Sequence, residues 1–189
     1  MGALLDQFKK DLAGAKLTKT AASRKWLFQK LSGISVNRNA MLRAGTVADV
    51  FIGQMFFFFY DPKTKKELPY YDKFPMVIPI EMYDDGFLGL NLHYLDPGLR
   101  IMLLDQLMTY VTNKKMDKTT RLRLSYDLIA NASKLEMAKP CIKRYLYSHI
   151  QSRFIFIEPN EWDMAAFLPT EQFVKANKKK VWNDSRNSF

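Results

Sequence analysis

Cysteine is almost absent from this sequence, since Cys141 is the only one among 189 residues. A single thiol excludes an intrachain disulfide, so the fold must rely on packing, as in proteins of a reducing cytosol. No run of about 18 uncharged apolar residues occurs, and the first residues, with Asp6 among them, lack the apolar stretch of a secretory leader. These absences predict a protein that neither is secreted nor spans a membrane.

Residues that commonly carry catalysis are also scarce. Histidine occurs only as His93 and His149, and with Cys141 these residues show none of the close spacings of a zinc site. Cys141 and His149 fall in one short segment without an orienting partner, which disfavours a nucleophilic pair. Neither GxxxxGK[ST] nor GxGxxG is present to hold a nucleotide. The sequence therefore predicts no enzymatic activity, no metal and no cofactor.

Clustered carboxylates between residues 61 and 85 are the one feature that would suit a metal-dependent nuclease, in which several acids converge beside a lysine. Aspartates are also the ordinary residues of turns, and solvated turns are the preferred interpretation. The acids concerned are Asp61, Glu67, Asp72, Glu81, Asp84 and Asp85.

Positive charge is what the chain has in excess, with a net charge of +10. Residues 1–45 hold nine basic and two acidic residues, and residues 101–150 hold nine and four, whereas residues 46–100 hold five and eight. This asymmetry favours a polyanionic partner, nucleic acid first of all. No helix-turn-helix or RRM signature appears, so sequence-specific readout is not predicted.

Strands are predicted in the middle of the chain, where "YDDG" is typical of a hairpin turn. The segments rich in β-branched and aromatic residues are 46–60, 74–82, 86–95 and 153–159. Pro75 and Pro79 lack an amide donor, which predicts a sheet edge or a bulge for their strand. Side chains alternate along a strand, so the run of phenylalanines places rings on both faces, and both faces must be covered.

Helices are predicted on either side of these strands. Asp96 followed by Pro97 is typical of a helix start. The other expected helices cover residues 3–14 and 20–31, begin near residues 117–119 and at Pro140, and cover 160–168 and 170–182, capped by Asn160 and Thr170.

This order of elements indicates an α+β fold: a small, strongly bent antiparallel sheet or an SH3-like barrel, with flanking helices. Three regions are expected, namely a basic helical N-terminal arm over 1–45, an α+β core domain over 46–168, and a C-terminal helix and tail over 169–189.

Two stretches, "YDPKTKKELPYYDKFPMVIPIEMYDDGFLGLNLHYL" and "SKLEMAKPCIKRYLYSHIQSRFIFIEPNEWD", resemble the DNA end-protector family of T4-like bacteriophages. The similarity covers roughly residues 46–168 and leaves out the first 45. The resemblance implies a virion protein, acting in the host cytoplasm, that binds the ends of linear double-stranded DNA and blocks host exonuclease without chemistry of its own. Other virion proteins are further candidate partners, whereas a membrane or a small-molecule substrate is not implied.

Contacts to a DNA end are predicted from charge and expected exposure, since basic side chains bind phosphates and tyrosine rings stack on terminal bases. The predicted contacts are Lys63, Lys65, Lys66, Tyr70, Tyr71, Lys114, Lys115, Arg121 and Arg123. An alternative from another class stays open, a structural subunit of a phage tail, baseplate or neck whose basic arm docks on a neighbour. A metal-dependent nuclease is the third.

Overall fold

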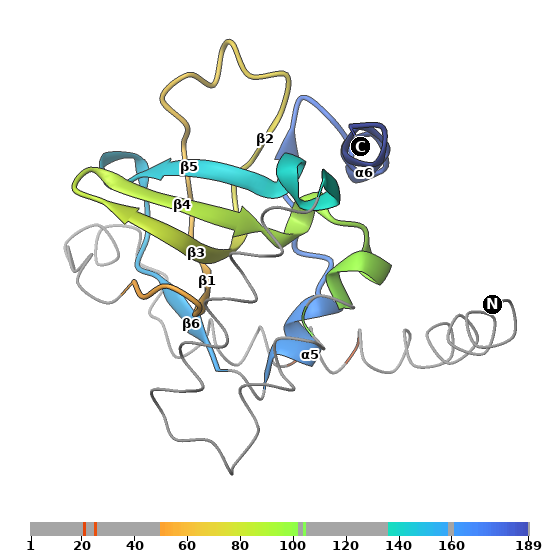
Figure 1. The fold of residues 1–189 in the computed structure, drawn as a ribbon, viewed down its shortest axis with the longest axis horizontal. Coiled ribbons are helices and arrows are strands. Elements are labelled where there is room, and N and C mark those ends of the chain that lie inside the picture. Colours follow the sequence, from red (N-terminus) through yellow and green to blue (C-terminus); the bar gives the residue numbers. More distant parts are fainter. Residues whose placement is uncertain are drawn as a thin grey trace, which may run out of the picture.

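The computed structural model describes residues 50–101, 104, 136–158 and 161–188, together with the isolated residues 21 and 25. At its centre is a five-stranded antiparallel sheet in the order β5-β4-β3-β1-β6 (Figure 1). The strands are β1 (Met55–Phe57), β3 (Met76–Tyr83), β4 (Gly86–Asn91), β5 (Ile142–Leu146) and β6 (Ile155–Ile157). A second sheet pairs β2 (Tyr71–Asp72) with β7 (Phe173–Val174).

Helical elements accompany these sheets, so the expected mixture of helices and an antiparallel sheet is confirmed. The expected barrel is not found: over the described residues the five-stranded sheet stays open, with β5 and β6 as its edges. Beyond the strands, the isolated bridge between Tyr60 and Ile150 links the segment after β1 to the connection between β5 and β6. One bridge does not make the continuous ladder that closure requires.

Strand β3 runs through the interior of the sheet, between β4 and β1, although it contains Pro79. Its pairing with β4 shifts register between Pro79 and Glu81. Such a bulge removes the need for an amide donor at the proline. The expected bulge is therefore confirmed and the edge position is wrong, while the hairpin turn at Asp84 and Asp85 lies where "YDDG" predicts it.

The phenylalanine run fills both faces of the sheet, as its alternation predicts. Phe57 belongs to one core cluster, where its ring stacks on Phe74 with the centroids 5.1 Å apart. Phe58 belongs to a second cluster on the other face, with Phe87 and Tyr145. Each face therefore has its own apolar core, which holds the sheet rigid from both sides.

The segment after Pro140 differs from the expected helix. It forms strand β5, flanked by the 3₁₀ helices η2 (Glu136–Cys141) and η3 (Tyr147–His149). Pairing with β4 places Tyr145 opposite Phe87, and their rings pack with centroids 5.4 Å apart. Burial of this aromatic pair outweighs a local helix preference, which is weak in a short segment.

The helix expected over residues 170–182 also differs, since it contains β7 followed by α6 (Lys178–Arg186). Asn177, not Thr170, caps α6, its side-chain oxygen accepting from the Lys180 amide at 2.9 Å. Val181 of this helix lies in the same core cluster as Phe57. Figure 1 shows α6 beyond the end of β4, where it contacts the 3₁₀ helix η1 (Leu92–Tyr94).

Two expected helix positions agree with the structure. Asp96 accepts hydrogen bonds from the amides of Gly98 and Leu99, and residues 97–101 are helical. Helix α5 (Trp162–Ala166) lies within the expected 160–168. The helices expected at 3–14 and from 117–119 lie outside the described residues, and of the helix expected at 20–31, within the N-terminal arm, only Ala21 and Lys25 are described, both as helical. Among the described helices, none is long and apolar enough to cross a bilayer.

Candidate nucleic-acid interface

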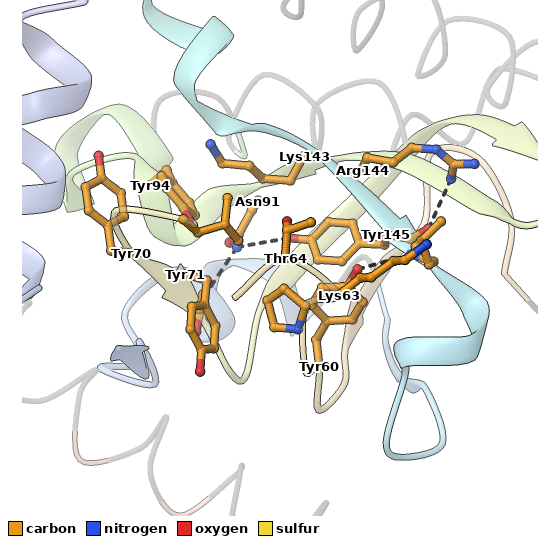
Figure 2. Close-up of a pocket in the computed structure, with 14 residues that line it drawn as sticks. Tyr60, Lys63, Thr64, Tyr70, Tyr71, Asn91, Tyr94, Lys143, Arg144 and Tyr145 are labelled. Carbon is orange, nitrogen blue, oxygen red and sulfur yellow. Dashed lines mark hydrogen bonds between the residues drawn. The ribbon is translucent and has the colours of Figure 1, made fainter. Parts of the chain in front are cut away.

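A pocket of about 350 Å³ opens between the lysine-rich loop of residues 61–70 and strand β5 (Figure 2). We call it the tyrosine pocket because five tyrosines line it: Tyr60, Tyr70, Tyr71, Tyr94 and Tyr145. The same loop bears the lysines expected to contact DNA. Aromatic rings beside basic side chains are the combination with which proteins hold unpaired bases.

The floor of the tyrosine pocket is a buried polar network centred on Asp72. One carboxylate oxygen of Asp72 lies 2.5 Å from Nδ1 of His93. The other oxygen accepts from the amides of Phe74 and Gln172, at 3.0 and 3.2 Å. Burial by itself would raise the pKa of Asp72, but the His93 ring and the two amides outweigh it and hold that pKa below its ordinary value. The carboxylate is thus charged and fully engaged at neutral pH.

Asn91, at the end of β4, extends this network to the wall of the pocket. Its side-chain nitrogen donates to the Tyr145 hydroxyl at 3.1 Å and to Asp72 at 3.4 Å (Figure 2). Its side-chain oxygen accepts from the His93 amide, and the far ring nitrogen of His93 lies 3.0 Å from Thr170 Oγ1. His93 is completely buried, and both of its ring nitrogens are hydrogen-bonded. This position suits a structural role, in which His93 stabilises the floor of the pocket.

Lys143 supplies a cation without an anion at the pocket wall. It lies on β5 opposite Gly89, and its Nζ lies 4.3 Å from the centre of the Tyr94 ring. Among the described residues it has no carboxylate partner, and burial lowers its pKa from the ordinary value. A desolvated ammonium held only by a ring face is poorly compensated, so an incoming anion would be favoured there.

Arg144, the next residue, is already engaged. Its guanidinium forms an ion pair with Asp85 and lies 4.3 Å from the centre of the Tyr83 ring. Neighbouring side chains of a strand point to opposite sides, and in Figure 2 the Arg144 guanidinium extends away from Lys143. Both residues line the pocket, but among the described residues only Lys143 of the two lacks a carboxylate partner.

Hydrogen bonds from Lys175 hold the lysine-rich loop in place. This residue has a positive φ of 68°, and its Nζ donates to the carbonyl oxygens of Lys65, Lys66 and Leu68 at 2.8 to 2.9 Å. Three carbonyls drawn to one ammonium fix the path of the loop, while the side chains of Lys63 and Lys66 are exposed. Within the described part of the chain neither of these two lysines has an ion-pair partner, whereas the Nζ of Lys65 lies 2.7 Å from Asp61.

The structure brings together four of the predicted contacts, Lys63, Lys65, Lys66 and Tyr70, on one loop. Tyr71 does not have the expected exposure, because its place in β2 leaves only 9% of it accessible. The remaining predicted contacts lie outside the described residues: Lys114, Lys115, Arg121 and Arg123. Lys143 is not among the predicted contacts, and its place on β5 differs from the helix expected there.

The acids considered for a nuclease site are dispersed over separate partners. Asp61 pairs with Lys65, Asp72 with His93 and Asp85 with Arg144. In the described ranges no group of three or more His, Cys, Asp or Glu side chains could hold a metal ion. Asp84 and Asp85 form the β3–β4 turn, as the turn interpretation predicts.

A family model described as the phage T4 terminal DNA protecting protein matches residues 3–185. No curated protein and no solved structure shows a significant match. The span corrects the expected limits of the similarity, since it includes nearly all of the first 45 residues and extends past residue 168.

Proposed function

Because this chain belongs to the family of the phage T4 terminal DNA protecting protein, we propose that it binds the ends of linear double-stranded DNA and shields them from host exonuclease, without chemistry of its own. The match over residues 3–185 carries the proposal. On this account the protein travels with the packaged DNA in the virion and acts in the host cytoplasm, where entering ends are attacked.

To shield a DNA end, the protein needs only to occupy it and does not need to catalyse a reaction. A protein that sits on a DNA end denies it to a nuclease, and phosphate contacts supply the necessary affinity. The exposed loop lysines Lys63 and Lys66, which have no ion-pair partner in the described part of the chain, suit this role. Lys114, Lys115, Arg121 and Arg123 stay further predicted contacts. Other virion proteins stay candidate partners on the rest of the surface.

A digestion assay tests the proposal directly. Linear plasmid is digested with a processive exonuclease, with and without stoichiometric protein. In a separate binding measurement, closed circular plasmid is the reference for linear plasmid. Linear DNA should survive many times longer with the protein, and binding should prefer linear over circular DNA. Equal rates of digestion at saturating protein would overturn the proposal. Assembly into a ring or wedge without affinity for DNA would favour the structural-subunit alternative.

A matched pair of variants connects this protection to the loop. Lys63→Glu reverses one charge in the lining of the tyrosine pocket. Arg153→Glu makes the same change at an exposed position two residues before β6, which does not line the pocket. Figure 1 shows β6 and the loop on different sides of the sheet's centre. The first variant should weaken protection and make it less dependent on salt, because it removes a phosphate contact. The second should leave both properties close to those of the parent protein.

A further inference from the structure

The lysines of the loop do not explain preference for an end. Every stretch of duplex offers the same phosphates, so cations alone bind the interior as well as the terminus. An end differs because its last nucleotide can leave the stack without opening base pairs on both sides. An element of the protein that engages a nucleotide only after it has left the duplex would supply this selectivity.

We infer that the tyrosine pocket receives one unpaired nucleotide from the DNA end, with its base against the tyrosine rings and its phosphate at the ammonium group of Lys143. This inference rests on the proposed function and explains how the same site distinguishes an end from the interior. It concerns described residues alone, those of the loop and β5 together with the neighbouring segments that complete the lining of the pocket.

The size and lining of the pocket fit such a ligand. Its volume of about 350 Å³ falls in the range of sites for small organic molecules, roughly 300 to 1,000 Å³, and is too small for a duplex. Flipped bases are held in pockets of this kind between aromatic and apolar side chains. The ring of Tyr70 is half-buried at the mouth, tilted by 36° to that of Tyr94, and Leu68 adds an apolar wall.

Three cations line the pocket, and two of them, from different walls, have no carboxylate partner among the described residues. Lys143 comes from β5 and Lys63 from the loop, and both line the cavity (Figure 2). Neither is paired with a carboxylate among the described residues, in contrast to Arg144, which binds Asp85. A desolvated charge without its counterion is costly to the fold. A phosphate entering with the nucleotide would supply that counterion for Lys143.

The floor does not oppose an anion. Among the described residues that line the pocket, Asp72 alone carries a carboxylate, and both of its oxygens are occupied, by His93 and Asn91 on one side and by two backbone amides on the other. The Tyr145 hydroxyl is likewise bonded to Asn91. The polar groups of the floor are already hydrogen-bonded to one another. The ligand is therefore selected by the shape of the pocket, by contacts with the rings and by the two lysines.

Three duplexes that differ only in the terminal pair test the inference. One has a mismatched pair, one a matched pair, and one a matched pair locked by an interstrand cross-link. Unpairing is easiest for the mismatch and prevented by the cross-link. The full-length protein should bind the mismatched end about tenfold more tightly than the matched end, and the cross-linked end about tenfold more weakly.

Variants assign the effect to the pocket. Lys143→Met should reduce the differences among the three ends to less than about twofold while leaving salt-dependent binding of duplex. Lys143→Arg should restore much of the preference, because it returns a cation to the wall. Arg153→Met, outside the pocket, should behave as the parent protein. Thermal unfolding of each variant separates loss of the site from loss of the fold.

The outcomes separate the inference from the function on which it rests. If all three ends bind equally, yet more tightly than closed circular DNA, the protein recognises ends without extracting a nucleotide and the inference is wrong. The inference is also wrong if the preference persists in Lys143→Met. If linear and circular DNA bind alike, the proposed function itself fails.

Discussion

His93 and Asp72 meet in the interior, where Nδ1 of the ring lies 2.5 Å from a carboxylate oxygen and both side chains are almost inaccessible, at 0% and 1%. The contact joins η1, which follows β4, to β2, and Asn91 extends it to Tyr145 on β5. Three segments distant in the chain are thus tied beneath the tyrosine pocket. Removing one member of a buried pair leaves its partner uncompensated, which makes the contact a sensitive point of the fold.

Asp72→Asn should destabilise the protein by about 3 kcal/mol, because it removes the carboxylate that bonds Nδ1 of the buried His93. The pKa of Asp72 is lowered in the folded state, since His93 and two amides outweigh the effect of burial. A lowered carboxyl pKa stabilises the fold above the unfolded value of about 4, and this stabilisation is lost as pH falls through the folded value. Urea unfolding at several pH values should show this acid loss in the parent and a smaller loss in the variant.

Asp61→Asn is the matched control, since it removes a carboxylate from an ion pair with Lys65 that lies at the surface. Pairs of this kind contribute at most about 1 kcal/mol. A loss as large as that of Asp72→Asn would contradict the importance assigned to the buried floor. A parent protein whose stability is unchanged down to the lowest pH would contradict the assignment of the acid loss to Asp72.

Gly86→Ala should weaken the pairing of β4 with β5. A Cβ atom at Gly86 would lie 1.9 Å from the carbonyl oxygen of Tyr145, a backbone atom that cannot move aside without breaking the ladder. We expect a loss of about 3 kcal/mol in unfolding free energy. At Gly98, in the first turn of the helix after Asp96, the nearest atom is the Asp96 side chain at 3.2 Å. Gly98→Ala should therefore be neutral or stabilising, by up to about 1 kcal/mol.

Lys175→Met should loosen the lysine-rich loop, because it removes the donor shared by the carbonyls of Lys65, Lys66 and Leu68. Faster hydrogen exchange at residues 64–68 is the expected result. End affinity should fall by a few-fold because the loop lysines are no longer positioned in advance. Lys179→Met, at an exposed position of α6, changes the charge equally and is the control. Equal loss of affinity in both variants would mean that net charge, not loop position, is what matters.

The sequence predicts those parts of this fold whose signals are local. The turn at Asp84 and Asp85 and the cap at Asp96 depend on residues within a few positions, and the alternation of the phenylalanine run depends on one strand. Strand β5 is different, because Ile142, Tyr145 and Leu146 stand at spacings that also suit a helix. Its pairing with β4, more than 50 positions earlier, decides the outcome.

The tyrosine pocket could not be predicted from local sequence signals for the same reason. Asn91 is 19 positions from Asp72 and 54 from Tyr145, and the three meet only because β4 lies beside β5 and close to β2. Lys143 then faces the pocket because it lies on the same side of β5 as Tyr145. Composition could indicate that cations bind a polyanion, but it could not select the half-buried lysine that has no carboxylate partner among the described residues.

Binding of DNA ends should depend on pH, because burial lowers the pKa of Lys143. Phosphate binds the ammonium form of Lys143. An ordinary lysine loses this form around its pKa of about 10.4, and a lysine with a lowered pKa loses it at a lower pH. Affinity for a mismatched end should therefore begin to fall at a lower pH than an ordinary lysine would give, by up to about tenfold per pH unit above the lowered pKa. Lys143→Arg, always charged, should remove this fall.

Stability should respond in the opposite sense. The folded pKa of Lys143 lies below the unfolded one, so the charged side chain costs stability at neutral pH, and the cost disappears as pH rises through the folded and then the unfolded value. Lys143→Met should accordingly raise the unfolding free energy at pH 7, by about 1 kcal/mol, while it removes the preference for frayed ends. A purely structural lysine would give the reverse, a less stable variant that still distinguishes the ends. Thermal melts and end binding measured on the same samples at pH 7 and 9.5 decide between the two.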